Sequence, residues 1–328
     1  MGRLSGDHGA RATAARRVSV VMAELFVVLT LLAGCTAAGP SSSSTAAPTT
    51  ARGQASATAS DPSISVVAAE GFYGELAQQI GGQYVSVYSM LNDPNADPHE
   101  YEPTVSDAKA IASAQVVVEN GLGYDAFVNQ LLTASPRPSR VVIDVGQLTG
   151  HKEGDNPHVW YDPATMPRVA QELASTFARL DPAHSGAFNA NLQAFQTSEK
   201  VVNDEIAALK ARYQGTKVLV TEPVFDYMAE ALGLDVVDLN GAFPRAVEEG
   251  NDPPASAVAD FRQQLTSRAV SALIVNGQTV TPITTQMQDL ARQSGVPVVV
   301  VTETEPKGKN YQQWMLDQLQ SLGKALGG

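Results

Sequence analysis

Short runs rich in valine and isoleucine alternate with longer segments of helical periodicity along most of this 328-residue chain. Strands that alternate with helices form parallel sheets joined by right-handed crossovers. The alternation is interrupted at residues 162–213, where no run resembles a strand and apolar residues recur near helical spacing. The pattern and the length predict two α/β lobes, each with a mostly parallel sheet flanked by helices.

The same periodicity places the individual elements. Strands are predicted at residues 64–69, 84–88, 116–118 and 140–143 of the first lobe, and at 217–221, 235–239, 272–275 and 296–302 of the second. Helices are predicted at 71–81, 104–114, 223–232 and 311–326. Thr104 is a suitable cap, and Asp107 lies in the positive first turn of its helix. Asp181 and Pro182 can begin a helix of about 30 residues, although two shorter helices fit the same pattern.

The N-terminus predicts export and lipidation. Arg16 and Arg17 precede an apolar run that ends at Gly34 and Cys35, and this run is shorter than the about 20 residues that a membrane span needs. Residues 1–34 are therefore a predicted lipoprotein signal peptide. Cys35 is the predicted lipidation site, the alternative being a buried core cysteine. Residues 35–62, rich in Ser, Thr, Ala and Pro, are expected to form a flexible tether to the outer face of the cytoplasmic membrane.

Charge and cysteine content restrict the possible partners. The chain carries a net charge of −12, and removal of the signal peptide makes it more acidic, because the peptide holds four arginines but one aspartate and one glutamate. This balance argues against nucleic acid and against an anionic membrane surface. The single cysteine excludes an intramolecular disulfide or a thiolate metal cluster.

Two loops each present a histidine after a proline. In the segment 97–104, Pro98 and Pro103 restrict the backbone on either side of His99. In the segment 156–163, His158 follows one proline, and another proline closes the loop. A single loop histidine is usually a solvated surface residue, but histidine is also the commonest metal ligand. Two stiff Pro-His loops in one chain favour a metal site.

From about Ser63 to the C-terminus, and most specifically in these two Pro-His segments, the chain resembles the metal-binding substrate-binding lipoproteins of bacterial zinc and manganese ABC importers. The resemblance implies that one long helix, at residues 181–213, joins the lobes of residues 63–180 and 214–328. It also implies a metal ion in the cleft between the lobes, held by His99 and His158 from the first lobe, and an ABC permease as partner.

Two further ligands are expected from the second lobe, at the carboxyl ends of its strands, where open α/β sheets bind ligands. Glu222 follows one predicted strand and Glu303 the last one, with Glu305 as a competitor. Otherwise, Glu222 would be a carboxylate at a helix N-terminus and Glu303 a solvated loop charge. The resemblance implies that Glu222 is the third ligand, because Phe225 and Tyr227 complete an aromatic motif of the family, and that Glu303 is the fourth.

The predicted ligand set bears on the metal. Zinc importers of this family typically hold the ion with three histidines, and many carry a long His-rich loop. This chain resembles them less in both respects, because Glu222 stands in the third ligand place and the loop at residues 150–155 holds only His151. Both departures argue against zinc as the only cargo, and the Glu at the third place favours manganese. Two imidazoles with two carboxylates are compatible with both Mn²⁺ and Zn²⁺ as cargo, and no organic cofactor is expected. His184 is predicted to lie on the surface of the long helix, and His8 belongs to the signal peptide.

Two other functions fit some of these residues. Two histidines and two carboxylates also form the sites of metal-dependent hydrolases, although the chain contains no His-Glu-x-x-His motif. In a surface adhesin lipoprotein the histidine loops would be incidental. The preferred prediction is a monomeric, non-enzymatic binding protein for a divalent transition metal.

Overall fold

The structure is a computed structural model that describes residues 64–95, 98–237 and 241–327, without the side chain of His99. The predicted signal peptide, the tether and Cys35 lie outside these residues. Among the helices of the described ranges, none combines the length and the apolar character needed to cross a membrane.

The first lobe contains a four-stranded parallel sheet in the order β2-β1-β3-β4. Its strands are β1 (Ile64–Glu70), β2 (Val85–Leu91), β3 (Val116–Glu119) and β4 (Val141–Asp144), and its helices are α1 (Gly71–Gly81), α2 (Val105–Ser113), α3 (Ala126–Ala134) and α4 (Val145–Thr149). Thr104 caps α2 in a reciprocal capping box with Asp107, as the sequence predicts.

Both faces of this sheet are covered because successive side chains of a strand point to opposite sides. Val67 and Val117 share a buried cluster with α2 and α3, whereas Val66 and Val116 belong to the cluster that includes α1 and α5 (Thr165–Leu180). The continuous apolar character of the predicted strands follows from this two-sided burial.

The second lobe repeats the arrangement with a parallel sheet in the order β6-β5-β7-β8. Its strands are β5 (Lys217–Val220), β6 (Asp235–Val236), β7 (Ala272–Asn276) and β8 (Val298–Val301), and its helices are α7 (Asp226–Leu232), α8 (Ala242–Glu248), α9 (Ala255–Thr266), α10 (Pro282–Ser294) and α11 (Tyr311–Ala325). The strand expected at 235–239 is shorter: its hydrogen-bonded part is β6, and residues 238 and 239 lie outside the described ranges.

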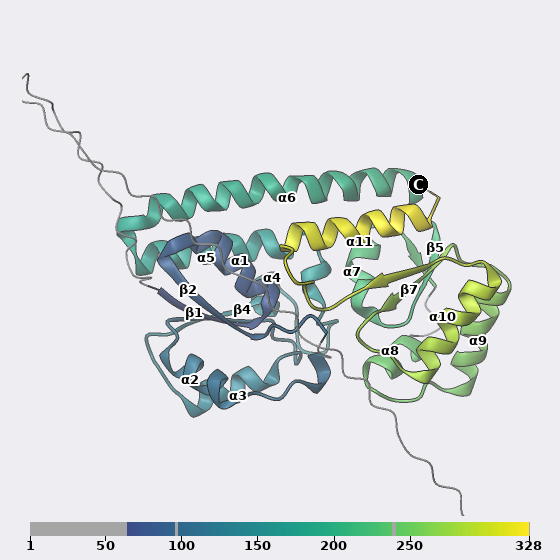
Figure 1. Ribbon diagram of the computed structural model, residues 1–328, viewed down its shortest axis with the longest axis horizontal. Coiled ribbons are helices and arrows are strands. Elements are labelled where there is room, and N and C mark those ends of the chain that lie inside the picture. Colours follow the sequence, from purple (N-terminus) through teal and green to yellow (C-terminus); the bar gives the residue numbers. More distant parts are fainter. Residues whose placement is uncertain (1–63, 96–97, 238–240, 328) are drawn as a thin grey trace, which may run out of the picture. The chain divides into compact units, whose positions relative to one another are not determined.

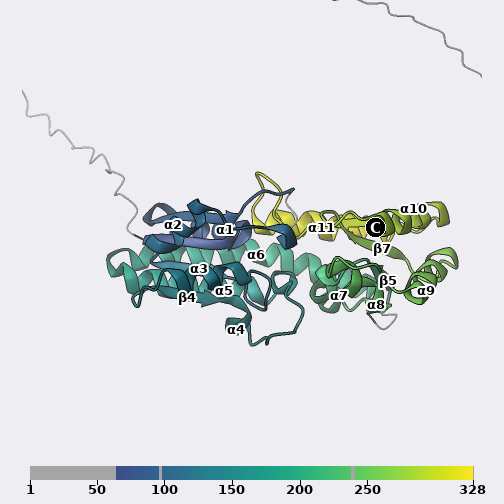
Figure 2. The ribbon, with the colours of Figure 1, turned by 90° about the horizontal axis from the view of Figure 1, so that it is seen from below.

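A single long helix, α6 (Ser185–Tyr213), occupies most of the strand-free region and resolves the two alternatives for it. Its 29 residues correspond to about 44 Å of helix. It packs against α1 and α5 of the first lobe and against α7 and α11 of the second, and Figures 1 and 2 show α6 and α11 side by side. The long helix therefore contacts both lobes.

The sequence placed His184 on the long helix, and this prediction is wrong. His184 lies in the 3-10 turn η4 (Pro182–His184), which precedes α6. Its ring stacks on Tyr84 at a centroid distance of 4.0 Å, and its Nδ1 lies 2.6 Å from a carboxylate oxygen of Asp181. The turn forms because Asp181 and Pro182 end one helical segment before α6 begins. His184 thus has a local structural role.

Residues of both sheets share one buried apolar cluster. At its centre Phe72 contacts Trp160 and Trp314, with centroid distances of 4.9 and 5.8 Å, and Tyr161 packs against Phe225 at 5.6 Å. The hydroxyl of Tyr161 also donates to the carbonyl oxygen of Thr302. These contacts bring the segment that follows His158 to the carboxyl end of β8, which Glu303 follows.

Candidate metal centre

The backbone of His99 lies in the 3-10 turn η2 (Pro98–Glu100), in the connection from β2 to α2. The chain that follows is anchored: the hydroxyl of Tyr101 donates to a carboxylate oxygen of Asp107 at 3.0 Å, and Asp107 belongs to the capping box of α2. This anchoring limits the positions available to the loop. The imidazole of His99 is outside the described part of the structure, so its role as a ligand remains a prediction.

His158 is fully buried and held by its neighbours. Its Nδ1 lies 2.7 Å from Oδ1 of Asn156, whose Nδ2 donates to the carbonyl oxygen of Pro223 at 2.7 Å. Because the Asn156 amide donates through nitrogen to Pro223, its oxygen faces the imidazole, and Nδ1 carries the hydrogen. In the neutral imidazole Nε2 then has a lone pair, and this atom lies 3.3 Å from Oε2 of Glu303. A hydrogen bond that fixes the imidazole in this way is typical of metal-ligating histidines.

Glu222 follows β5 and is 2% exposed. Its Oε2 accepts a hydrogen bond from Nδ2 of Asn276 at 2.7 Å, and its buried Oε1 has no hydrogen-bond partner within the described ranges. Burial raises the pKa of this carboxyl group to about 7, because the ionised form loses its hydration. An unpartnered buried carboxylate oxygen is costly unless a proton or a cation compensates it.

Glu303 follows β8 and is fully buried. Its Oε1 accepts from Nδ2 of Asn276 at 2.6 Å, and its Oε2 accepts from the hydroxyl of Tyr124 at 2.9 Å. The side-chain oxygen of Gln278 accepts the backbone N–H of Glu303. Residues from both lobes therefore fix this carboxylate beside His158.

The structure thus brings together three of the four predicted ligands. His158 contacts Glu303 directly, and Asn276 bridges Glu303 to Glu222. Within the described ranges, these three side chains do not by themselves form a group arranged to hold a metal ion, and no other group of three or more His, Cys, Asp or Glu does so. The predicted site needs the fourth side chain, that of His99.

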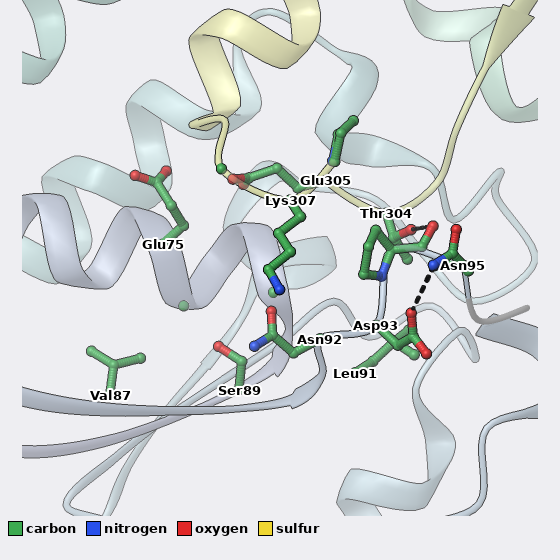
Figure 3. Close-up of a pocket in the computed structure, with 15 residues that line it drawn as sticks. Glu75, Val87, Ser89, Leu91, Asn92, Asp93, Asn95, Thr304, Glu305 and Lys307 are labelled. Carbon is green, nitrogen blue, oxygen red and sulfur yellow. Dashed lines mark hydrogen bonds between the residues drawn. The ribbon is translucent and has the colours of Figure 1, made fainter. Parts of the chain in front are cut away.

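Glu305, the competitor for the fourth ligand position, lies elsewhere. It lines a cavity of about 700 Å³ between the β2–η2 loop and the segment after Glu303 (Figure 3). Burial, and then the charge of Glu75 on the same cavity, raise the pKa of Glu305 to about 8. The lining of this cavity includes neither His158 nor Glu303. The geometry therefore favours Glu303 as the ligand.

The other described loop histidine, His151, has local partners. Its Nδ1 lies 2.9 Å from the hydroxyl oxygen of Thr149, and its ring meets Tyr227 edge to face. Neither contact involves a carboxylate or a second imidazole, so these partners do not make His151 part of a metal site.

Sequence reasoning missed four polar residues that position the predicted ligands: Tyr124, Asn156, Asn276 and Gln278. Asn276 could have been found, because it ends a buried strand at the edge where Glu222 and Glu303 emerge. Asn156 lies two residues before His158, a position from which a side chain can reach the same ring. Nothing in the local sequence marks Tyr124, which reaches Glu303 across 179 residues of chain.

Comparison with known proteins gives the family. The model of the family described as "Zinc-uptake complex component A periplasmic" matches residues 66–325. Manganese-binding lipoprotein MntA of Bacillus subtilis (strain 168) is 24% identical over 286 residues, which cover 81% of this chain and 90% of that protein. The iron ABC transporter substrate-binding lipoprotein MtsA of Streptococcus pyogenes serotype M1 is 23% identical over 286 residues, which cover 80% and 89% of the two chains.

Solved structures show the same fold. The periplasmic zinc-binding protein TroA from Treponema pallidum aligns with a TM-score of 0.68 at 17% identity and covers 81% of this chain and 99% of that chain. The Mn²⁺ complex of FpvC from Pseudomonas aeruginosa aligns with a TM-score of 0.66 at 22% identity, with coverages of 80% and 98%. The resemblance found in the sequence is confirmed: this chain belongs to the zinc-uptake complex component A family, among the metal-binding substrate-binding proteins of ABC importers.

Proposed function

We propose that this protein captures one divalent transition-metal ion with His99, His158, Glu222 and Glu303 and delivers it to an ABC permease. The observation that carries the proposal is the approach of His158 Nε2 to Glu303 Oε2 at 3.3 Å. Since Nδ1 of His158 faces the side-chain oxygen of Asn156, the neutral imidazole directs the lone pair of Nε2 toward the carboxylate oxygen of Glu303. A cation between them would interact favourably with both.

Binding without catalysis is the preferred form of this function. A catalytic zinc site holds its ion with three protein ligands and leaves a position for water or substrate, whereas four protein ligands close a tetrahedral site. The proposed set has four. Relatives such as ScbA of Streptococcus cristatus are named substrate-binding lipoproteins of metal ABC transporters, which supports a carrier rather than a hydrolase.

Manganese is the preferred cargo. Two carboxylates make the ligand set harder than three imidazoles would, and carboxylate oxygens suit manganese. MntA relatives are named for manganese, whereas MtsA is named for iron and TroA for zinc. Intrinsic affinity nevertheless rises from manganese to zinc at most such sites. The purified protein is therefore expected to bind zinc more tightly while manganese is the transported ion.

Growth of a strain that lacks the gene distinguishes the two cargoes. Under manganese starvation the strain is expected to grow more slowly than its parent, with recovery on added manganese and on expression of the gene. Under zinc starvation the two strains are expected to grow alike. A deletion strain that only zinc rescues would contradict the manganese assignment, whatever metal the purified protein prefers.

We also propose that Cys35 is lipidated and anchors the protein on the outer face of the cytoplasmic membrane. The Cys35→Ser variant has no thiol to receive the lipid, so it is expected in the soluble fraction or as an uncleaved precursor. Fractionation with an antibody, together with the mass of the mature N-terminus, measures this. A wild-type protein found soluble and cleaved at another residue would contradict the anchor.

A further inference from the structure

The side-chain amide of Asn276 lies between the two predicted carboxylate ligands. Its Nδ2 is 2.7 Å from Oε2 of Glu222 and 2.6 Å from Oε1 of Glu303. An amide nitrogen carries two hydrogens, so it can give one to each carboxylate. A longer contact, 3.1 Å, joins the same nitrogen to the hydroxyl of Thr279.

The orientation of this amide is fixed by its surroundings. Asn276 is the last residue of β7 and is 3% exposed. Its Oδ1 accepts the backbone N–H of Gln278 at 3.1 Å, and its own backbone N–H points to the hydroxyl of Thr221 at 3.3 Å. A flipped amide would lose the bond from Gln278 and place its oxygen between two carboxylates. The nitrogen therefore faces the acids.

Each carboxylate consequently presents its other oxygen toward the proposed site. For Glu222 this is Oε1, which is buried and has no hydrogen-bond partner in the described ranges. For Glu303 it is Oε2, which lies 3.3 Å from Nε2 of His158. To chelate an ion with both oxygens, either carboxylate would have to use the oxygen that already accepts from Asn276, so the amide competes with the ion for that oxygen.

We propose that Asn276 is a specificity-determining residue that limits Glu222 and Glu303 to one metal bond each. This inference rests on the proposed function. With two imidazoles, two monodentate carboxylates give four ligands, the number that zinc takes in closed protein sites. Manganese favours six ligands, mostly oxygen, which bidentate carboxylates would help to supply. Asn276 thus raises the affinity for zinc relative to that for manganese.

The first test is made on the wild-type mature protein. Zinc is added alone, and X-ray absorption spectroscopy counts the nitrogen and oxygen atoms bound to it. The expected result is four, with both carboxylates monodentate. Bidentate carboxylates in this spectrum would overturn the inference, and this outcome needs no variant.

The second test compares zinc and manganese affinities, by competition with a chelator, in the wild-type protein and in Asn276→Leu, which removes both amide hydrogens and keeps the branched shape of the side chain. The ratio of zinc to manganese affinity is expected to fall roughly tenfold, within the range of effects of residues behind metal ligands. Asn276→Ala serves the same purpose if the leucine variant does not fold. The control is Asn191→Ala, whose amide donates to the carbonyl oxygen of Ile80.

The outcomes separate this inference from the proposed function. A fall in the ratio in the Asn276 variants, with the control unchanged, supports the role of Asn276. Tight binding of both metals with an unchanged ratio would reject that role and leave the proposed function in place. A wild-type protein that binds neither metal would reject the proposed function itself.

Discussion

The His158→Ala variant is expected to bind divalent metal at least about 100-fold more weakly than the wild-type protein. Loss of a residue that only orients a ligand costs 10- to 100-fold in metal affinity, and loss of the ligand itself should cost more. His158 is fully buried with its Nε2 directed at Glu303, so solvent cannot readily supply a replacement ligand. Isothermal titration with Mn²⁺ and with Zn²⁺ measures the change. His99→Ala should have an effect of similar size.

The chain offers two matched controls for this prediction. His151 contacts Thr149 and Tyr227, and His184 contacts Tyr84, so neither faces a predicted ligand. His151→Ala and His184→Ala should change metal affinity by less than about twofold, although His184→Ala removes a stacking contact worth about 1 kcal/mol of stability. If His158→Ala or His99→Ala retained full affinity, the proposed ligand set would be wrong.

Metal affinity is also expected to fall more than 100-fold between pH 7.5 and pH 5.5. Burial raises the pKa of Glu222 to about 7, so below this pH its carboxyl group holds a proton that the metal must displace. Imidazole ligands must also be neutral to bind metal, and imidazole in water has a pKa near 6.5. Each proton displaced lowers the affinity about tenfold per pH unit below its pKa.

The contribution of Glu222 to the stability of the metal-free protein changes with pH in the opposite direction to metal affinity. Because the pKa of Glu222 is higher in the folded chain than the ordinary value of 4.5, its contribution to stability is complete below pH 4.5 and is lost as the pH rises through about 7. Acidification should therefore release metal without a matching loss of stability from this group. Affinity measured at pH 5.5, 6.5 and 7.5, with thermal unfolding followed in parallel, tests both statements. An affinity that does not change over this range would argue against these ligands.

The strand and helix pattern was predictable because most of it depends on local chemistry. Strands β1, β3, β5 and β7 are largely buried on both faces, so each contains a run of three or four consecutive apolar residues. The start of α2 follows from Thr104 and Asp107, which cap it within four residues of chain. The length of β6 was not predictable, because its apolar run extends beyond the two residues that pair with β5.

The candidate site was predictable in part for a similar reason. Glu222 and Glu303 lie just after β5 and β8, so their approximate positions follow from the order of the elements. His158 lies beyond α4, and its Pro-His loop rather than a strand end marked it. The choice between Glu303 and Glu305 depends on how the chain turns after β8, which the sequence does not specify. The bridge made by Asn276 depends on contacts that span 27 and 54 residues of chain, and it appears only when β5, β7 and β8 lie side by side.

The most direct test of the central claim is a crystal structure of the mature protein with manganese, with anomalous scattering used to locate the ion. The predicted result is one strong peak bound by Nε2 of His158, one oxygen each of Glu222 and Glu303, and the imidazole of His99. Zinc in place of manganese should give a peak at the same position. A peak in the cavity lined by Glu305, or an ion that contacts none of these four side chains, would contradict the proposed ligand set.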